Sequence, residues 1–185
     1  MAEYYLISQL PSLDGISENT PLPITSERFE ELCRRFLGKK AQVESEKLTL
    51  APSRNYEKSA SSLIEKWNDG ERSLRLALAK LRADKMNKQF DAEIQSFSAG
   101  LLQAVRTAVE FEGPMEAERF LNKYRLDFLE TLRPMDSFSE EFVFYYGLKL
   151  KLLERIRKFD SESGETAYRN IYHSIMNGER SEATQ

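Results

Sequence analysis

The chain has very little of the chemistry that builds metal centres and disulfide bonds. Its 185 residues include one cysteine, Cys33, and one histidine, His173. A lone cysteine cannot close an intramolecular disulfide, which favours a reducing compartment. The two residues together cannot complete a Cys/His zinc site, and one histidine rules out the repeated Glu-x-x-His pattern of a di-metal carboxylate bundle. We therefore expect no metal and no cofactor.

Recognisable catalytic motifs are also missing. The sequence has neither a Gly-rich phosphate loop nor a G-x-S-x-G elbow. Acidic pairs such as Glu140–Glu141 fall on helical stretches, where solvated faces explain them better than acid–base pairs. His173 fits a surface or edge position better than a catalytic one, and Cys33 fits a buried small hydrophobe better than a reactive thiol. These absences predict a protein that is not an enzyme.

Glycine, proline and long apolar runs are scarce as well. Eight glycines and six prolines leave few forced breaks, which favours long helices. The longest uncharged helical stretch, 94–105, is far shorter than the roughly 20 residues of a membrane span, and the N-terminus lacks a signal peptide. A net charge of −3 supplies no field to gather nucleic acid or anionic lipid. We expect a cytoplasmic protein that reaches a membrane only through partners.

Hydrophobic periodicity in the first half of the chain predicts helices separated by weakly patterned segments. Residues 4–13 fit a short strand or an apolar helical turn equally well. A helix capped by Thr25 or Ser26 follows and ends at Gly38. The stretch 39–53 has a weak pattern, with a brief strand or extended loop at Leu48 and Leu50. A helix from Asn55 to about Trp67, a turn at 68–70 and a further helix over 74–81 complete this half.

The second half of the chain has a stronger helical pattern. A helical hairpin is expected over 91–134, broken at Gly113-Pro114. Ser137 and Glu140 have capping-box spacing, and the longest helix follows to about Phe159. A last helix covers 167–175. The predicted fold is therefore all-α, apart from the uncertain N-terminal segment: an antiparallel bundle of about six to seven helices forming one domain over 1–178, with a disordered tail at 179–185.

Aromatic residues are unusually dense at the start of the longest expected helix. Five aromatics lie within nine positions, namely Phe138, Phe142, Phe144, Tyr145 and Tyr146. They cannot all point to one side of a helix, so they pack on two sides of a core or provide an anchor for a protein interface. We predict a protein-interface site at Phe142, Phe144, Tyr145 and Tyr146, with Phe144 or Tyr146 as the anchor.

A basic stretch is the remaining candidate for binding. Its members are Arg72, Arg75, Lys80, Arg82, Lys85 and Lys88. Glu71 and Asp84 interrupt it, and no flanking aromatics are available to stack on bases. We interpret it as the solvated surface of an amphipathic helix, with a patch for an acidic partner as the alternative. No nucleic-acid partner is expected.

The N-terminal sequence Tyr4-Tyr5-Leu6-Ile7-Ser8-Gln9-Leu10-Pro11, followed by Pro23-Ile24-Thr25 and Phe29, carries a resemblance. It resembles the start of a small bacterial family of uncharacterised proteins that are typically encoded beside V/A-type ATPase subunits. The likeness implies an association with that ATPase and implies no chemistry for the quoted residues.

The C-terminal part is similar to the end of the C-type subunit of the same ATPases, which is called d in eukaryotes. The comparable residues are Leu152, Leu153, Glu154, Arg155, Ile156 and Arg157, then Arg169, Asn170 and Ile171. In that family, the C-type subunit is an all-helical cup that sits on the rotor ring and grips the central stalk. The resemblance implies a non-catalytic accessory or stalk-coupling component of a proton- or sodium-translocating ATPase. The alternative is a general helical adaptor or regulator with another protein partner.

Overall fold

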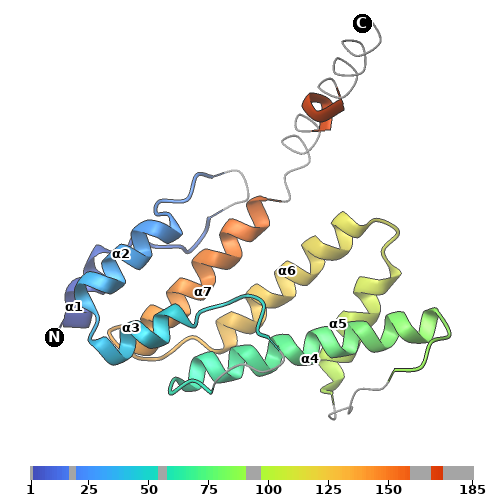
Figure 1. Cartoon of the computed structure of the whole chain (residues 1–185), viewed down its shortest axis with the longest axis horizontal. Coiled ribbons are helices and arrows are strands. Elements are labelled where there is room, and N and C mark those ends of the chain that lie inside the picture. The colour runs from blue at the N-terminus through green and yellow to red at the C-terminus, as the bar shows by residue number, and fades with distance from the viewer. Residues whose placement is uncertain (1, 17–19, 54–57, 91–96, 159–167, 173–185) are drawn as a thin grey trace, which may run out of the picture.

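The computed structural model describes residues 2–16, 20–53, 58–90, 97–158 and 168–172, and every element within these ranges is helical (Figure 1). The helices are α1 (Ala2–Gln9), α2 (Ser26–Phe36), α3 (Lys39–Glu46), α4 (Ser62–Lys85), α5 (Ala99–Glu110), α6 (Pro114–Thr131) and α7 (Glu140–Arg157), and residues 168–172 are also helical. The described part of the chain contains no strand, and its N-terminal segment forms a helix. The prediction of an all-α helical bundle is confirmed. The expected tail at 179–185 lies outside the described residues.

The weakly patterned stretch after α2 forms a helix rather than a strand or loop. Two contacts explain α3, whose own sequence has no clear apolar stripe. Ala41 is buried in the core, and the Gln42 side-chain amide donates to the backbone carbonyls of Arg34 and Leu37, at 2.8 and 2.7 Å. The exposed carbonyls at the end of α2 are thereby satisfied by the next helix. Periodicity missed α3 because contacts with α2 stabilise it.

The turn expected at 68–70 is wrong, because α4 runs without a break from Ser62 to Lys85. Gly70 lies inside this helix, where a Cβ atom would clash with the ring of Phe128 on α6. The glycine therefore serves close packing between two helices. Residues 54–57, where a helix was expected to start, lie outside the described part. Ser61 caps α4 by accepting a hydrogen bond from the Ile64 amide, at 3.2 Å.

Two other helix starts can be compared with their predicted caps. Of the two expected caps, Thr25 and Ser26, Thr25 caps α2, and its Oγ1 accepts from the amide of Arg28 at 3.3 Å. The capping box expected at Ser137 is wrong, because Ser139 is the cap of α7 and accepts from the Phe142 amide at 3.2 Å. Ser139 Oγ also donates to the carbonyl of Asp136, at 2.7 Å, which fixes the preceding turn.

Two hydrophobic cores lie along the molecule. The first core contains Leu6, Leu13, Ile24, Phe29, Leu32, Cys33, Leu37, Ala41, Leu48, Leu63, Ile64, Trp67, Leu129, Val143, Phe144, Tyr145, Tyr146, Leu148, Leu150 and Leu152. The second core contains Leu74, Ala77, Leu78, Leu101, Val105, Ala108 and Leu121. Helices α4 and α6 contribute to both, whereas α1, α2, α3 and α7 contribute only to the first among the described residues and α5 only to the second.

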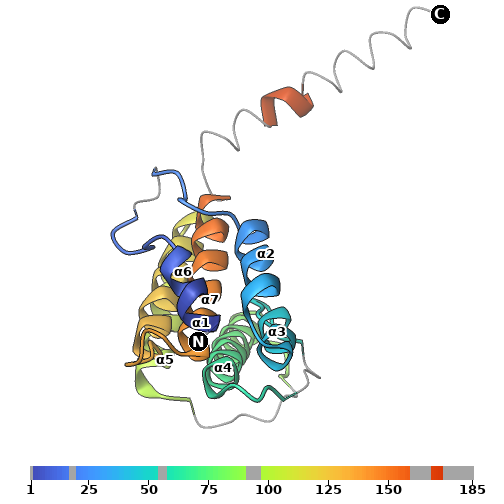
Figure 2. The ribbon, with the colours of Figure 1, turned by 90° about the vertical axis from the view of Figure 1, so that its left-hand side faces the viewer.

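Helix α7 is the central element of the first core. Residues 143–150 are all buried, because α2, α3, α4 and α6 each contact this helix. Figure 2 shows α7 between α6 and α2. Gly147 permits the closest approach, since a Cβ atom there would lie 2.8 Å from the ring of Phe29 and 2.7 Å from Leu48. None of the described helices is both long enough and apolar enough to cross a membrane.

Candidate functional site

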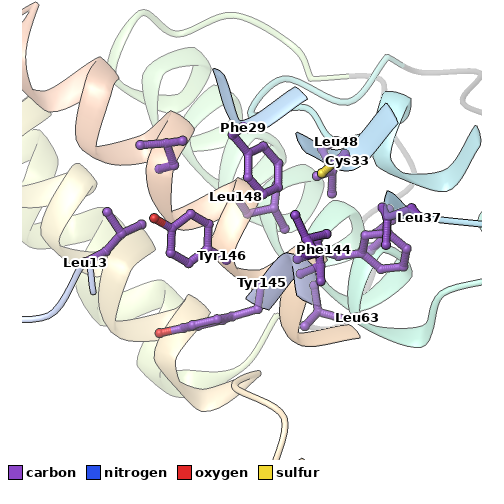
Figure 3. Packing of buried hydrophobic residues seen from close by; sticks show 14 of the residues in the cluster. Leu13, Phe29, Cys33, Leu37, Leu48, Leu63, Phe144, Tyr145, Tyr146 and Leu148 are labelled. Atoms are coloured by element: carbon purple, nitrogen blue, oxygen red, sulfur yellow. The ribbon is translucent and has the colours of Figure 1, made fainter. Parts of the chain in front are cut away.

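The predicted aromatic interface lies mostly inside the molecule. Phe144, Tyr145 and Tyr146 are 3%, 2% and 5% exposed and belong to the first core (Figure 3). An anchor for a partner was expected at Phe144 or Tyr146, and the structure places both side chains against the protein's own helices. The physical reason is that four other helices surround α7, so both of its apolar faces are covered. Phe142 is half-buried and packs beside Tyr145, with ring centroids 5.8 Å apart.

The hydroxyl groups of these tyrosines bind the chain's own polar groups. Tyr146 donates to the carbonyl of Pro11, at 2.8 Å, and Tyr145 donates to Glu130 Oε1, at 2.7 Å. Burial raises the pKa of Tyr146, and burial together with the Glu130 carboxylate raises the pKa of Tyr145 to about 12. Both phenols therefore stay protonated at neutral pH. They hold the segment after α1 and the end of α6 against α7.

Lys149 completes this polar cluster. Its ammonium donates to Asp14 Oδ1 at 2.6 Å, to Glu130 Oε1 at 2.7 Å and to the Tyr145 hydroxyl at 3.3 Å. Burial alone would lower the pKa of Lys149, but the hydrogen bonds to the two carboxylates outweigh it and raise the pKa. The lysine is therefore charged and fully engaged, which suits a positioning role and excludes a nucleophilic amine at neutral pH.

A second cluster of charges is buried between the two cores. Glu71 of α4 and Arg125 of α6 are 2% and 6% exposed. Arg125 Nε donates to Glu71 Oε2 at 3.0 Å and its Nη2 donates to Oε1 at 3.1 Å, so the pair is bidentate. Arg75 adds a further donor to Glu71 at 3.0 Å. Glu71 and Arg75 are four residues apart on one helix, but nothing in the sequence pairs Glu71 with Arg125.

The same cluster reaches α7 through Glu118. Arg125 Nη1 donates to Glu118 Oε1 at 3.3 Å and to Asn122 Oδ1 at 3.1 Å, and Arg155 Nη2 of α7 donates to Glu118 Oε1 at 2.6 Å. We call Glu71, Arg75, Glu118, Asn122, Arg125 and Arg155 the ionic layer. Its carboxylates already bind guanidinium groups, so this arrangement joins helices and is not arranged for acid–base chemistry.

Exposed aromatic side chains gather at the start of α1 and the turn before α7. Tyr4, Tyr5 and Phe138 are 57%, 62% and 52% exposed. The rings of Tyr4 and Phe138 are stacked, with centroids 4.9 Å apart, and Tyr5 meets Tyr4 edge-on at 6.4 Å. We call these three residues the aromatic patch. Sequence reasoning singled out the neighbourhood of Phe138 but missed its pairing with Tyr4, because the two lie far apart in the sequence.

An open groove of about 580 Å³ lies between α3, the residues before α4 and the start of α7. It is lined by Lys39, Lys40, Ala41, Val43, Glu44, Ala60, Ser61, Glu140, Glu141 and Phe144, and we call it the α3–α7 groove. Phe144 is therefore part of a groove floor rather than a projecting anchor. Glu141 accepts from Ser61 Oγ at 2.8 Å and from the Ser62 and Leu63 amides, both at 3.2 Å, so it caps the start of α4.

A second groove, of about 500 Å³, follows the C-terminal half of α7. It is lined by Leu48, Thr49, Leu50, Lys151, Glu154, Arg155 and Lys158. The carbonyls of Leu48, Thr49 and Leu50 accept hydrogen bonds from three different helical side chains: Lys151, Trp67 and Arg75, respectively. The basic side chains of this groove are thus used in part to fix an extended segment of the chain.

The remaining predicted residues have plain structural environments. Cys33 is 2% exposed, and burial, with a smaller contribution from Glu30, raises the pKa of its thiol to about 12, which confirms the interpretation as a buried hydrophobe. Most of the basic stretch lies on α4, and its Lys85 donates to the carbonyl of Val109 at 2.9 Å. His173 lies outside the described residues. Within the described ranges, no three His, Cys, Asp or Glu side chains are grouped to hold a metal.

Comparison with known proteins bears on the second half of the chain. No curated protein and no solved structure matches it. Residues 100–179 match a family whose description is "Protein of unknown function (DUF2764)". This match begins in α5 and includes α6 and α7. It therefore contains residues of both hydrophobic cores and four members of the ionic layer, Glu118, Asn122, Arg125 and Arg155.

Proposed function

We propose that this chain is a non-catalytic accessory or stalk-coupling component of a bacterial V/A-type ion-translocating ATPase, similar in role to the C-type subunit. Two stretches of sequence suggest this role, one at residues 4–29 and one at residues 152–171. The proposal assigns the chain protein partners in the rotor ring and the central stalk. It places the protein at the cytoplasmic side of the membrane through those partners.

The observation that carries the proposal is the direct contact between the two suggestive stretches. Glu154 accepts hydrogen bonds from the Ser26 amide at 2.8 Å and from Ser26 Oγ at 2.6 Å, so a residue of the C-terminal stretch caps the helix of the N-terminal stretch. Phe29 also stacks on Tyr146, with ring centroids 5.6 Å apart. Residues that are 128 positions apart are thus in direct contact, so the two short likenesses lie side by side in the fold.

The aromatic patch is the surface we assign to the ATPase contact. Tyr4 and Tyr5 belong to the N-terminal stretch, yet both side chains are more than half exposed and the core does not account for them. Tyrosine is enriched in the energetic centres of protein interfaces, because a rigid ring buries much area at little cost in conformational entropy. Stacking of Tyr4 on Phe138 also holds the patch in one arrangement before a partner arrives.

The experiment is affinity isolation of a tagged chain from gently solubilised membranes of the native host. The wild-type chain is expected to recover ATPase stalk subunits. The double variant Tyr4→Ser/Phe138→Ser is expected to lose them, since truncating an interface centre costs about 2 kcal/mol or more, roughly thirtyfold in affinity. The matched control is Met86→Ser at the end of α4, which removes another exposed apolar side chain far along the sequence.

Two results of this isolation would count against the proposal. Recovery of no ATPase subunit by the wild-type chain would remove the ATPase role. Equal recovery by the wild type and the Tyr4→Ser/Phe138→Ser variant would remove the aromatic patch as the contact. Far-ultraviolet circular dichroism of each variant checks that the helices are intact.

The aromatic patch also supports a second function, that of a helical adaptor for a different protein. The patch is an interaction surface whatever the partner is, because three aromatic rings are exposed side by side. The same isolation separates the two functions. Recovery of one protein in constant ratio, without ATPase subunits and dependent on Tyr4 and Phe138, would favour the adaptor.

A further inference from the structure

The floor of the α3–α7 groove is apolar and buried. Ala41 and Phe144 are each 3% exposed, and both line the groove. Val43 is 53% exposed on the wall formed by α3. A large apolar side chain entering from solvent would therefore contact Val43, Ala41 and Phe144 together. Grooves of this size and lining accept an apolar helix face or a few bulky side chains.

The charges inside the groove are already compensated, whereas those on its rim are open to solvent. Glu44 accepts from Lys47 Nζ at 2.9 Å, from the Ala60 amide at 3.2 Å and from Ser59 Oγ. Glu141 caps α4 as described above. On the rim, Lys39 and Lys40 at the start of α3 are both exposed, and Glu140 at the start of α7 is exposed on the opposite wall. The groove thus presents an apolar floor beside a pair of cationic side chains, which suits an apolar segment with an acidic flank.

The chain itself carries a segment of this kind. In the helical residues 168–172, Tyr168, Ile171 and Tyr172 are 68%, 60% and 51% exposed and share one helical face. Tyr168 and Tyr172 are stacked with centroids 6.3 Å apart, which makes a continuous aromatic surface. The sequence just before this helix, 159–167, contains three acidic residues and no basic one. Apolar face and acidic flank therefore match the floor and the rim of the groove.

The distance from the end of α7 to the groove indicates whether residues 168–172 dock in their own chain or in a second copy. The groove contacts the first turn of α7, and the 168–172 helix follows the last turn. An 18-residue helix is about 27 Å long, and nine residues span at most about 30 Å. From Phe144 on the groove floor to Arg157, α7 rises about 20 Å, so docking within one chain would need 159–167 to double back along most of α7. Figure 1 also places the 168–172 helix beyond the C-terminal end of α7, away from α3.

We propose that residues 168–172 of one copy dock in the α3–α7 groove of a second copy, and that the exchange is reciprocal. Two identical contacts related by a twofold axis then close the dimer and fill both grooves. The aromatic patch takes no part in this contact and stays available to another partner. The inference goes beyond the proposed ATPase role and concerns the purified chain alone.

The test is the mass of the purified full-length chain in solution, measured by size-exclusion chromatography with light scattering over a range of concentrations. The wild type is expected at twice the 21.5 kDa of one chain. Two variants are expected to raise the dissociation constant at least tenfold: Tyr168→Ser/Tyr172→Ser in the segment and Lys39→Glu/Lys40→Glu on the rim. The matched control Tyr4→Ser/Tyr5→Ser removes two equally exposed tyrosines and is expected to leave the dimer unchanged.

A cross-link identifies which copy supplies the segment. In the pair Val43→Cys/Asn170→Cys both positions are exposed and the tyrosines of the docking face are kept, and the buried Cys33 does not compete. Mixed isotope-labelled and unlabelled chains are expected to give cross-links between copies. A monomeric wild type, a dimer indifferent to both the segment and the rim variants, or a cross-link confined to single chains would each overturn the inference. Because all substituted side chains are exposed, circular dichroism is expected to show unchanged helix content.

Discussion

The two cores of this protein differ in size and in how they are closed. The first contains twenty buried hydrophobic residues among those described, the second seven. The first includes Trp67, Tyr145 and Tyr146, whose polar ends are all hydrogen-bonded, whereas the second is made of Leu, Ala and Val. Side-chain caps from distant residues, Glu141 on α4 and Glu154 on α2, also fasten the first core. We infer that the second core opens more readily.

The ionic layer lies where one core gives way to the other. On α4, first-core residues end at Trp67 and second-core residues begin at Leu74, with Glu71 between them. On α6, Arg125 lies between Leu121 of the second core and Leu129 of the first. A buried ion pair adds little net stability, but removal of one partner strongly destabilises the fold because the other charge is left buried and unpaired. The layer therefore specifies how α4 and α6 are aligned.

The largest expected effect comes from breaking this layer. Arg125→Met leaves Glu71 buried with Arg75 as its remaining guanidinium, and we expect a loss of about 3–5 kcal/mol in the free energy of unfolding. Urea denaturation followed by circular dichroism measures it. The double variant Glu71→Gln/Arg125→Met is expected to lose less than the single variant, because no buried charge is left alone. Arg28→Met, in an exposed pair with Glu31, is the control, at about 0.5 kcal/mol.

Leucine-to-alanine changes in each core test whether the cores open separately. Leu148 and Leu121 are 0% and 3% exposed, and each replacement is expected to cost about 2–5 kcal/mol. Hydrogen exchange then distinguishes them. Leu121→Ala is expected to lower protection in α5 and the first half of α6 while α7 stays protected, and Leu148→Ala to lower protection throughout. Equal loss in all helices for both variants would show that the two cores behave as one.

Alanine substitutions at two glycines are expected to have smaller effects of opposite sign on stability. Gly70→Ala places a Cβ atom against the Phe128 ring, where helix and helix meet, and is expected to cost about 1–3 kcal/mol. Gly100→Ala meets nothing within 4 Å in the first turn of α5 and is expected to stabilise by about 0.5 kcal/mol. Thermal unfolding measures both. A neutral Gly70→Ala would mean that α4 and α6 can separate at no cost.

Acid is expected to weaken the first core by a small amount. The hydrogen bond from Lys149 lowers the pKa of Asp14, and for Glu130 hydrogen bonds from Lys149 and Tyr145 outweigh burial and lower its pKa. A carboxyl whose pKa is lowered by folding stabilises the fold at a pH above the pKa that it has in the unfolded chain, near 4. That stabilisation is lost as the pH falls through the lower pKa of the folded state. Because both carboxylates are well exposed, the effect is shallow.

The variant Lys149→Met provides the check on this pH dependence. It is expected to flatten the decline in unfolding free energy between about pH 5 and pH 2, measured by urea titrations at each pH. An acid slope identical to that of the wild type would show that Lys149 does not hold these carboxylates. Lys151→Met is the matched control, because Lys151 contacts neither Asp14 nor Glu130 in the described contacts.

The sequence predicted the elements whose signals are local. Thr25 at the start of α2 and Gly113-Pro114 between α5 and α6 are chemical markers that act within a few residues. Helix α3 and the continuity of α4 were missed, because they depend on Gln42 reaching the end of α2 and on Phe128 packing over Gly70. Propensity and periodicity contain no information on such contacts.

The candidate sites were predicted less well, for a related reason. Periodicity showed that α7 has two apolar faces but could not show that four helices cover them, so core packing on two sides and an interface anchor at Phe144 or Tyr146 both remained open. The aromatic patch and the ionic layer join Tyr4 to Phe138 and Glu71 to Arg125, pairs that no spacing rule connects. Exposure of an aromatic residue is a property of the folded chain.

Isolation of the ATPase itself tests the proposed role most directly. A tag on one of the nucleotide-hydrolysing subunits of the native host's V/A-type ATPase allows the complex to be purified from gently solubilised membranes and its components quantified by mass spectrometry. We predict that this chain is recovered in constant ratio to the central stalk, and that Tyr4→Ser/Phe138→Ser abolishes its recovery without affecting that of the stalk. Complete recovery of the stalk and rotor ring without this chain would contradict the proposed role.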